Sequence, residues 1–206
     1  ITNNVFGINL GYSHHNNITS NNITANIQYG IYLGHSEDNS IWGNNITATE
    51  WYAIYLSNSA HNSIWGNNIT ANSRFGVYLS YSSRNSIWGN SIANNLDGIL
   101  LCQFSYYNAI SGNNITANKD YGIYLSYSSD ILGFHNSVYH NNFVNNTNQV
   151  YSKVSVNIWD DGYPSGGNYW SDYTDVDLYS GPNQDLLGSD AIWDNPYVID
   201  TNNQDR

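Results

Sequence analysis

The chain has 206 residues, of which 40% are hydrophobic and only 10% are charged, and its formal net charge is −11 at pH 7. The hydrophobic content excludes wholesale disorder, and no apolar run reaches the ~18 residues that would span a bilayer. The negative charge argues against nucleic acid as a partner, and the single cysteine, Cys102, excludes an intrachain disulfide and a thiolate zinc cluster.

Isoleucines recur every 23 residues in the first three quarters of the chain, at Ile18, Ile41, Ile64, Ile87 and Ile110. A second aliphatic set follows five residues after each of them, and a third lies in Gly-Ile-Tyr-Leu blocks such as residues 30–33. After Leu125, an insertion at residues 131–135 precedes the point where the pattern resumes. A repeat of this length, rich in Gly, Asn, Ser and β-branched residues, predicts a solenoid of short strands.

Alternate residues within each repeat are apolar, so that Ile31 and Leu33 are expected to point inward and Tyr32 outward. Coils stacked at ~4.8 Å would align equivalent residues into ladders around a dry interior. Asparagines two residues before the inward Ile, such as Asn39 and Asn62, would hold the turns and bond to the amides of neighbouring coils. The sequence therefore predicts an all-β, right-handed parallel β-helix of about six to seven coils over residues 1–156.

Acidic residues are concentrated in the last quarter of the chain. Residues 1–156 carry six carboxylates and four Lys or Arg, a net charge of −2, whereas residues 157–206 carry ten Asp and only Arg206, a net charge of −9. This change predicts a boundary near Asn157, with residues 157–206 as an acidic, aromatic capping segment of the same domain. The chain begins without Met and inside a repeat, from which we expect a processed product or a piece of a longer protein.

Catalytic carboxylates are hard to find in the predicted coils. Enzymes on such a fold need clustered carboxylates on one sheet face, with Lys or Arg nearby. The carboxylates of the coils are expected to fall at different positions and not to converge; they are Glu37, Asp38, Glu50, Asp97, Asp120 and Asp130. The adjacent Asp160 and Asp161 are the remaining weak candidates, and the main expectation is a protein without catalytic activity.

Metal sites have two candidate sources. The six histidines, which include the adjacent His14 and His15, lack a common spacing and are expected to be solvated turn residues rather than copper or zinc ligands. The C-terminal segment offers acidic oxygens at short spacings, which suit the six to eight oxygen ligands of calcium. The alternatives there are a calcium site or a solvated acidic loop, and no other cofactor is expected; the residues are Asp175, Asp177, Asp185, Asp190 and Asp194.

Aromatic residues form two predicted outward columns. One contains Trp42, Trp65 and Trp88, and the other contains Tyr32, Tyr55, Tyr78 and Tyr124. Rows of exposed rings can stack on sugars or on another protein, and large apolar patches mark interfaces. The alternative is that ring stacking only stabilises neighbouring coils.

N-glycosylation sequons recur along the chain. They begin at Asn17, Asn22, Asn45, Asn68, Asn114 and Asn145. Asn22, Asn45 and Asn68 would lie on successive coils, where glycans would collide, so the motif is interpreted mainly as a by-product of the strand turn. Sparse modification, for example at Asn145, is the alternative.

Three stretches of the C-terminal segment carry a family resemblance: residues 157–161 (Asn-Ile-Trp-Asp-Asp), 166–173 (Gly-Gly-Asn-Tyr-Trp-Ser-Asp-Tyr) and 194–199 (Asp-Asn-Pro-Tyr-Val-Ile). With the Asn-rich coils, they make the whole chain similar to the NosD-like family of right-handed β-helix proteins with repeats of the carbohydrate-binding and sugar-hydrolase type. The resemblance implies an archaeal cell-surface or surface-layer-associated protein, often one module of a larger one. The usual Asp-Gly-Ile-Gly-Asp run of the family reads Asp190-Ala-Ile-Trp-Asp194 here, which weakens the calcium interpretation.

Three functions follow as hypotheses, all of them extracellular and without a membrane span. The first is a non-catalytic structural or adhesive protein of an archaeal cell envelope, which binds other envelope proteins or copies of itself in a filament, sheet or stacked oligomer. The second is a glycan-binding module that uses the outward Trp and Tyr columns as a platform for polysaccharide. The third is a polysaccharide lyase or glycoside hydrolase.

Overall fold

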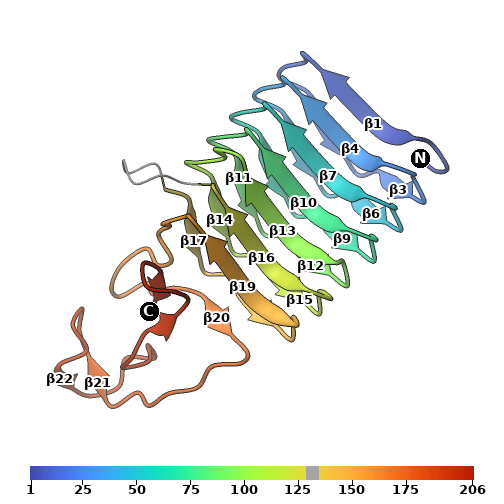
Figure 1. The fold of residues 1–206 in the computed structure, drawn as a ribbon. Helices are drawn as coiled ribbons and strands as arrows, with labels where there is room; N and C mark the ends of the chain where they lie inside the picture. Colours follow the sequence, from blue (N-terminus) through green and yellow to red (C-terminus); the bar gives the residue numbers. More distant parts are fainter. Residues whose placement is uncertain (129–134) are drawn as a thin grey trace.

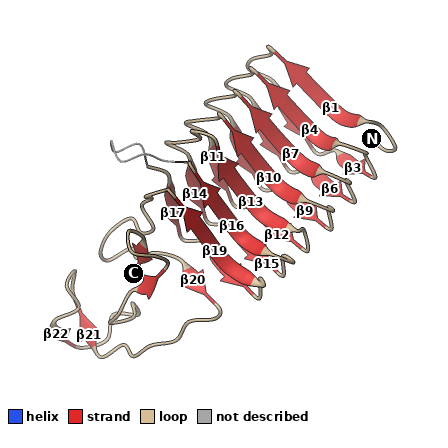
Figure 2. Ribbon diagram, viewed as in Figure 1, coloured by secondary structure: helices blue, strands red, loops and turns tan. Residues whose placement is uncertain are grey.

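A computed structural model of the chain describes residues 1–128 and 135–206, and within these ranges it is an all-β parallel β-helix with a C-terminal cap (Figure 1). The coils stack side by side from β1 to β19, and the cap covers the end of the stack (Figure 1). The described residues contain no helix (Figure 2), and so none that could cross a membrane. The predicted insertion at residues 131–135 lies, except for His135, outside the described residues, as does Asp130.

Three parallel sheets form the walls of the solenoid. Sheet 1 contains β1 (Phe6–Gly11), β4 (Tyr29–Gly34), β7 (Tyr52–Ser57), β10 (Phe75–Ser80), β13 (Asp97–Cys102), β16 (Tyr121–Ser126) and β19 (Asn148–Lys153). Sheet 2 contains β2 (Asn17–Thr19), β5 (Ser40–Trp42), β8 (Ser63–Trp65), β11 (Ser86–Trp88), β14 (Ala109–Ser111) and β17 (Ser137–Tyr139). Sheet 3 contains β3 (Asn22–Thr24), β6 (Asn45–Thr47), β9 (Asn68–Thr70), β12 (Ser91–Ala93), β15 (Asn114–Thr116), β18 (Asn142–Val144) and β20 (Tyr169–Trp170).

The strand register confirms the predicted fold. Ile41 pairs with Ile64, and Ile64 pairs with Ile87, so that residues 23 apart lie on neighbouring strands. These side chains are fully buried in one hydrophobic core that runs along the solenoid. The coil that contains β13 departs from the repeat, because Val77 pairs with Ile99 (99 − 77 = 22) and Ile99 pairs with Ile123 (123 − 99 = 24).

Asparagine ladders hold the turns between the sheets. Asn67 is an example, because its Oδ1 accepts hydrogen bonds from both the backbone N and the Nδ2 of Asn44, at 3.0 Å each. Its Nδ2 donates to the carbonyl oxygens of Ile41 (2.9 Å) and Trp65 (3.1 Å) and to Oδ1 of Asn90 (2.9 Å). Asn62 of the predicted column bonds in the same way, since its Nδ2 donates to the carbonyl oxygens of Ser36 and Ala60 and to Oδ1 of Asn85, which confirms the prediction for that column.

The cap continues the core and the ladders with different chemistry. Trp159 and Trp170 pack in the same core as the coil isoleucines, and β20 pairs with β18. The ladder that contains Asn67 continues through Asn141 to Asn168, whose backbone N and Nδ2 both donate to Oδ2 of Asp205, at 2.8 and 3.1 Å. Two short antiparallel pairs complete the cap: β21 (Tyr179–Ser180) with β22 (Leu186–Leu187), and β23 (Tyr197–Val198) with β24 (Gln204–Asp205).

One glycine of the cap is required by this arrangement. A Cβ atom at Gly167 would lie 1.6 Å from Oδ1 of Asp205, far inside any contact distance. The residue before Asn168 in the Gly-Gly-Asn stretch therefore has to be glycine, so that the carboxylate can approach the end of the ladder.

Candidate functional site

The outer face of sheet 1 is covered by aromatic rings, which we call the aromatic face. Two adjacent columns contribute, one from the first residue of each strand and one from the fourth. The rings touch one another in both directions; they belong to Phe6, Tyr29, Tyr32, Tyr52, Tyr55, Phe75, Tyr78, Tyr121, Tyr124 and Tyr151. The predicted column of Tyr32, Tyr55, Tyr78 and Tyr124 therefore forms one half of a broader surface.

The rings stack nearly parallel between β7 and β10, whereas Tyr32 and Tyr55 are tilted by 39°. Tyr55 and Tyr78 lie 4.7 Å apart between centroids with an interplanar angle of 8°, and Tyr52 and Phe75 lie 5.0 Å apart at 5°. These values are those of offset parallel stacks, in which neighbouring rings cover each other's faces. The edges of the rings and the tyrosine hydroxyl groups are therefore what such a stack presents to solvent.

Strand β13 interrupts both columns. Its first residue is Asp97 in the register position of Phe75, and its fourth is Leu100, which lies between Tyr78 and Tyr124. The missing rings leave a depression of about 350 Å³ on the aromatic face. We call this depression the ring gap; it is lined by Phe75, Asp97, Leu100, Cys102, Tyr124 and Ser126.

Asp97 is the most unusual side chain of the ring gap. It is only 6% exposed, and its Oδ1 accepts a hydrogen bond from the backbone N of Tyr121 at 3.0 Å. Burial raises the pKa of Asp97 to about 6, the charge of Asp120 adds to this effect, and the hydrogen bond opposes it. Beside it, the Tyr78 hydroxyl and the Cys102 Sγ form a hydrogen bond of 3.2 Å.

Asp97 was not among the site residues predicted from the sequence. It was expected to lie apart from the other carboxylates of the coils, and the charge of Asp120 contributes to the rise of the Asp97 pKa after the effect of burial. A signal was present in the sequence, because the residue before each Gly-Ile or Gly-Val pair of sheet 1 is aromatic at Tyr29, Phe75 and Tyr121 but acidic before Gly98. Counting from the isoleucines alone hid this position, since the β13 coil is one residue short.

The tryptophan column lies on sheet 2. Trp42 and Trp65 are 4.9 Å apart between ring centroids, Trp65 and Trp88 are 5.0 Å apart, and both pairs have interplanar angles of 5°. Trp88 is the most exposed of the three, at 45%. Both faces of the Trp65 ring are covered by its neighbours. Trp88 pairs with Ser111 on its other side, so one face of its ring has no neighbouring ring in the tryptophan column.

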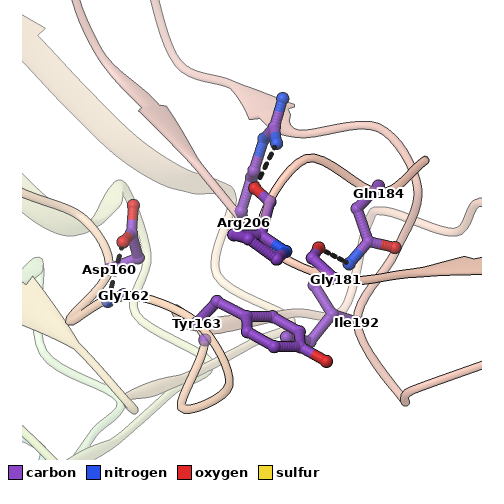
Figure 3. Close-up of a pocket in the computed structure, with 9 residues that line it drawn as sticks. Asp160, Gly162, Tyr163, Gly181, Gln184, Ile192 and Arg206 are labelled. Carbon is purple, nitrogen blue, oxygen red and sulfur yellow. Dashed lines mark hydrogen bonds between the residues drawn. The ribbon is translucent and has the colours of Figure 1, made fainter. Parts of the chain in front are cut away.

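The two acidic candidates of the cap point to different partners. Oδ1 of Asp160 accepts a hydrogen bond from the backbone N of Gly162 at 2.9 Å, beside a pocket of about 200 Å³ that Tyr163 and Arg206 also line (Figure 3). Asp161 instead lies 3.2 Å from Nε2 of His140 and accepts a hydrogen bond from Ser165. The Asp160 and Asp161 carboxyl groups therefore do not converge on one position.

The carboxylates considered for calcium hold the loops of the cap. Asp177 accepts hydrogen bonds from the backbone of Asp190 and Ala191 and from Ser189, and these bonds lower its pKa. Asp175, Asp190 and Asp194 likewise accept backbone N–H groups, and Asp185 is exposed. Across residues 1–128 and 135–206, no three His, Cys, Asp or Glu side chains come together in a group that could hold a metal ion.

The sequon asparagines are all exposed, but they are not equivalent. Nδ2 of Asn45 donates to Oδ1 of Asn22 at 2.9 Å, and Nδ2 of Asn68 donates to Oδ1 of Asn45 at 2.7 Å. A glycan on Asn45 or Asn68 would replace one of these amide hydrogens and crowd the next coil. Asn114 lies in the same column but is separated from Asn68 by Ser91. Asn145 stays the predicted example of sparse modification.

Solved structures with similar folds include carbohydrate-active and phage proteins. The periplasmic alginate epimerase AlgG is 21% identical with a TM-score of 0.59, over 75% of this chain and 43% of that chain. The A-module of the mannuronan C-5 epimerase AlgE6 of Azotobacter vinelandii is 17% identical with a TM-score of 0.58, over 76% of this chain and 54% of that chain. The Dettilon tailspike protein gp208 is 18% identical with a TM-score of 0.50, over 74% and 44% of the two chains. The chain thus spans about half the length of these proteins, and the likeness shows a shared fold.

No curated protein matches the chain by sequence. The family model of NosD, described as a periplasmic copper-binding protein, matches residues 1–50 and 44–175. Copper is held by imidazole, thiolate and thioether ligands, whereas this chain has no Met and one Cys, and the described part of it assembles no metal-binding group. Its described residues therefore do not fit a copper site. The extent of the match over the coils and the start of the cap nevertheless establishes that the chain belongs to the NosD family.

Proposed function

We propose that this protein is a non-catalytic, adhesive carbohydrate-binding β-helix that works outside the cytoplasm, with the aromatic face of sheet 1 as its contact surface. The observation that carries the proposal is the length of that face, which β13 alone interrupts in both columns. Its rings run from Phe6 on β1 to Tyr151 on β19, six strand steps apart in sheet 1, which is about 29 Å at one strand spacing per coil.

The chemistry of this face suits a sugar chain. Tyrosine combines an apolar ring with a hydroxyl group that donates and accepts hydrogen bonds, which matches the apolar C–H faces and hydroxyl rims of sugars. The rigid stack also loses little side-chain entropy when a ligand binds. The periplasmic family name and the alginate epimerases and tailspike of similar fold support a location outside the cytoplasm and a polysaccharide partner.

Affinity electrophoresis of the full chain through gels that contain soluble neutral or acidic polysaccharides tests the proposal. The wild type should be retarded, and the double variant Tyr32→Ala/Tyr55→Ala should lose most of the retardation while keeping its circular dichroism spectrum. The triple variant Trp42→Ala/Trp65→Ala/Trp88→Ala is the matched control and should stay retarded. Absence of retardation in every gel, or its loss in the triple variant alone, would contradict the proposal.

A polysaccharide-modifying enzyme is the second candidate, and Asp97 is the observation that favours it. A carboxyl group with a pKa of about 6 can give or take a proton near neutral pH, and Asp97 lies in a depression on a sheet face. Incubation with each retained polysaccharide, followed by mass spectrometry and NMR of the products, distinguishes the two functions. Cleaved or epimerised products that disappear in Asp97→Asn would establish an enzyme.

Self-association of the chain is a separate proposal, which follows from the sequence. A structural envelope protein would form filaments, sheets or stacked oligomers as its concentration rises. Light scattering over a wide concentration range tests it, and a strictly monomeric particle would count against it.

A further inference from the structure

We propose that the ring gap at β13 is the specific sugar subsite of the aromatic face and that it holds one uncharged pyranose ring of a polysaccharide. The inference rests on the proposed function and adds to it a defined position and a class of ligand. It follows from three observations: which ring faces are free, which polar atom lies in the gap, and which charges surround it.

Free ring faces are rare on this surface. Between β4 and β10, a ring such as Tyr55 has rings on both sides, Tyr32 and Tyr78. At β13 the two ring positions hold Asp97 and Leu100 instead. Phe75 and Tyr124 line the gap, and no ring of β13 covers the side of either ring that faces it.

The rings on the two sides of the gap lie on β10 and β16, two strand steps or about 9–10 Å apart in sheet 1. Between them lie the Asp97 and Leu100 side chains, which are smaller than the rings at the same positions of the neighbouring strands. A pyranose over β13 would lie on these two side chains and contact Phe75 of one column and Tyr124 of the other, the two rings that line the gap.

The polar atom in the gap selects a sugar over an aromatic ring. Asp97 is more than nine-tenths buried, and its Oδ1 accepts the Tyr121 backbone N–H. Within residues 1–128 and 135–206, its Oδ2 has no hydrogen-bond partner. A sugar hydroxyl can donate to this oxygen, whereas an inserted phenyl ring has no hydrogen-bond donor for it.

The charges around the gap select an uncharged sugar. The residues that line it include one carboxyl group and no Lys, Arg or His. Asp120 adds a second negative charge close enough to raise the pKa of Asp97. A uronate carboxylate would be repelled by both groups and would find no cation in the lining. The preferred ligand is therefore a neutral glycan, in contrast to the alginate named for the epimerases of similar fold.

Isothermal titration calorimetry of the full chain with cellohexaose, chitohexaose and an alginate hexamer tests the proposal. The test variant is Asp97→Tyr, which restores the ring found at this position on β4, β7 and β16. The matched control is Ser111→Trp, which adds a ring to the tryptophan column on sheet 2, since Ser111 pairs with Trp88. A third variant, Asp97→Asn, keeps the shape of the gap and removes only the carboxylate.

We expect at least one neutral hexasaccharide to bind and the alginate hexamer to bind at least tenfold more weakly. Asp97→Tyr should reduce the affinity at least tenfold, Asp97→Asn several-fold, and Ser111→Trp not at all. Unchanged binding by a folded Asp97→Tyr, or by Asp97→Asn if the tyrosine variant fails to fold, would overturn the subsite but leave the aromatic face as the binding surface.

The other outcomes identify different failures. Tighter binding of the alginate hexamer would overturn the ligand class while keeping the proposed function. A wild type that binds none of the three sugars would overturn the proposed function and the subsite with it. If Asp97→Tyr changed the oligomeric state in light scattering without affecting sugar binding, the gap would instead receive a side chain of a second copy.

Discussion

The coils and the cap use the same asparagine ladders but end them with different chemistry. In the coils, a buried amide such as Asn67 accepts two hydrogen bonds through Oδ1 and donates through Nδ2, so one rung can be followed by another. In the cap, the ladder ends on Asp205, whose Oδ2 accepts from Asn168 and from Nε1 of Trp170. Among the residues that the structure describes, no further rung follows Asp205, so its carboxyl group closes the ladder.

The comparison distinguishes residues that recur at the same position of every coil from residues that occur at a single position of the solenoid. A repeated rung has the same partners on every coil, and its contribution to stability is predictable from its neighbours. A residue used once, such as Asp205 in the cap or Asp97 in the body, meets an environment that no other coil supplies. Residues that depart from the repeat therefore close the C-terminal end of the ladder, as Asp205 does, and line the proposed sugar subsite, as Asp97 does.

The largest expected effect comes from a buried rung. Asn67→Ala removes the partner of the Asn44 amide and of the Ile41 and Trp65 carbonyl groups, so several buried polar groups lose a hydrogen bond. At about 1–3 kcal/mol for each buried group left unpaired, we expect the free energy of unfolding to fall by about 3–5 kcal/mol. The matched control is Asn68→Ala next to it, an exposed amide whose loss should cost less than about 0.5 kcal/mol. Urea unfolding measures both, and equal losses would contradict the assignment of the ladder as the main polar support.

A smaller and local effect is expected at the end of the ladder. Asp205→Ala leaves the Asn168 amide and Nε1 of Trp170 without their acceptor, which should cost about 1–3 kcal/mol. Because Asp205 has no successor in the stack, the loss should appear in the cap before the coils. Hydrogen exchange should therefore speed up at the Asn168 amide and stay unchanged at the Asn67 amide. A uniform increase along the chain would show that cap and coils unfold as one unit.

The carboxyl group of Asp205 also makes the cap sensitive to pH. Burial raises its pKa from 3.8 to about 7, with help from the charge of Asp160, while hydrogen bonds from Asn168 and Trp170 oppose the shift. The folded state therefore favours the protonated form, and its stabilising effect is complete below pH about 4 and is lost as the pH rises through about 7. The melting temperature of the wild type should fall over this range relative to Asp205→Asn, which cannot titrate there. Parallel profiles for the two proteins would show that Asp205 ionises normally.

The sequence predicted the coils well because their physics is periodic. The inward positions of Ile41, Ile64 and Ile87 follow from strand alternation and a constant repeat, and the register confirms them. The cap was harder, since Asn168 and Asp205 are 37 residues apart and belong to no repeat. That a carboxylate ends the ladder, and that Gly167 makes room for it, depends on contacts between segments that local sequence does not link.

The candidate site was predictable only in part. The outward tyrosine and tryptophan columns could be read from spacing, but the covering of one ring face by the next depends on side-chain geometry. The sequence therefore pointed to the tryptophan and tyrosine columns and not to Asp97, where both ring columns of sheet 1 are interrupted. The signal for Asp97 was a break in a pattern, and a break is visible only after the register of each coil is known.

The smallest expected effect restores the repeat at the ring gap. Leu100 lies between Tyr78 and Tyr124 in the strand register, and Leu100→Tyr would complete that column. A stacked aromatic pair contributes about 0.5–1.5 kcal/mol beyond the area it buries, so we expect a rise in the free energy of unfolding of about that size, measured by urea unfolding. The same substitution fills part of the ring gap and should weaken binding of the neutral hexasaccharide. A variant that is more stable and binds less well would show that the missing ring costs stability and is kept for the ligand, whereas a less stable variant would show that Leu100 is simply the residue that packs best at this position.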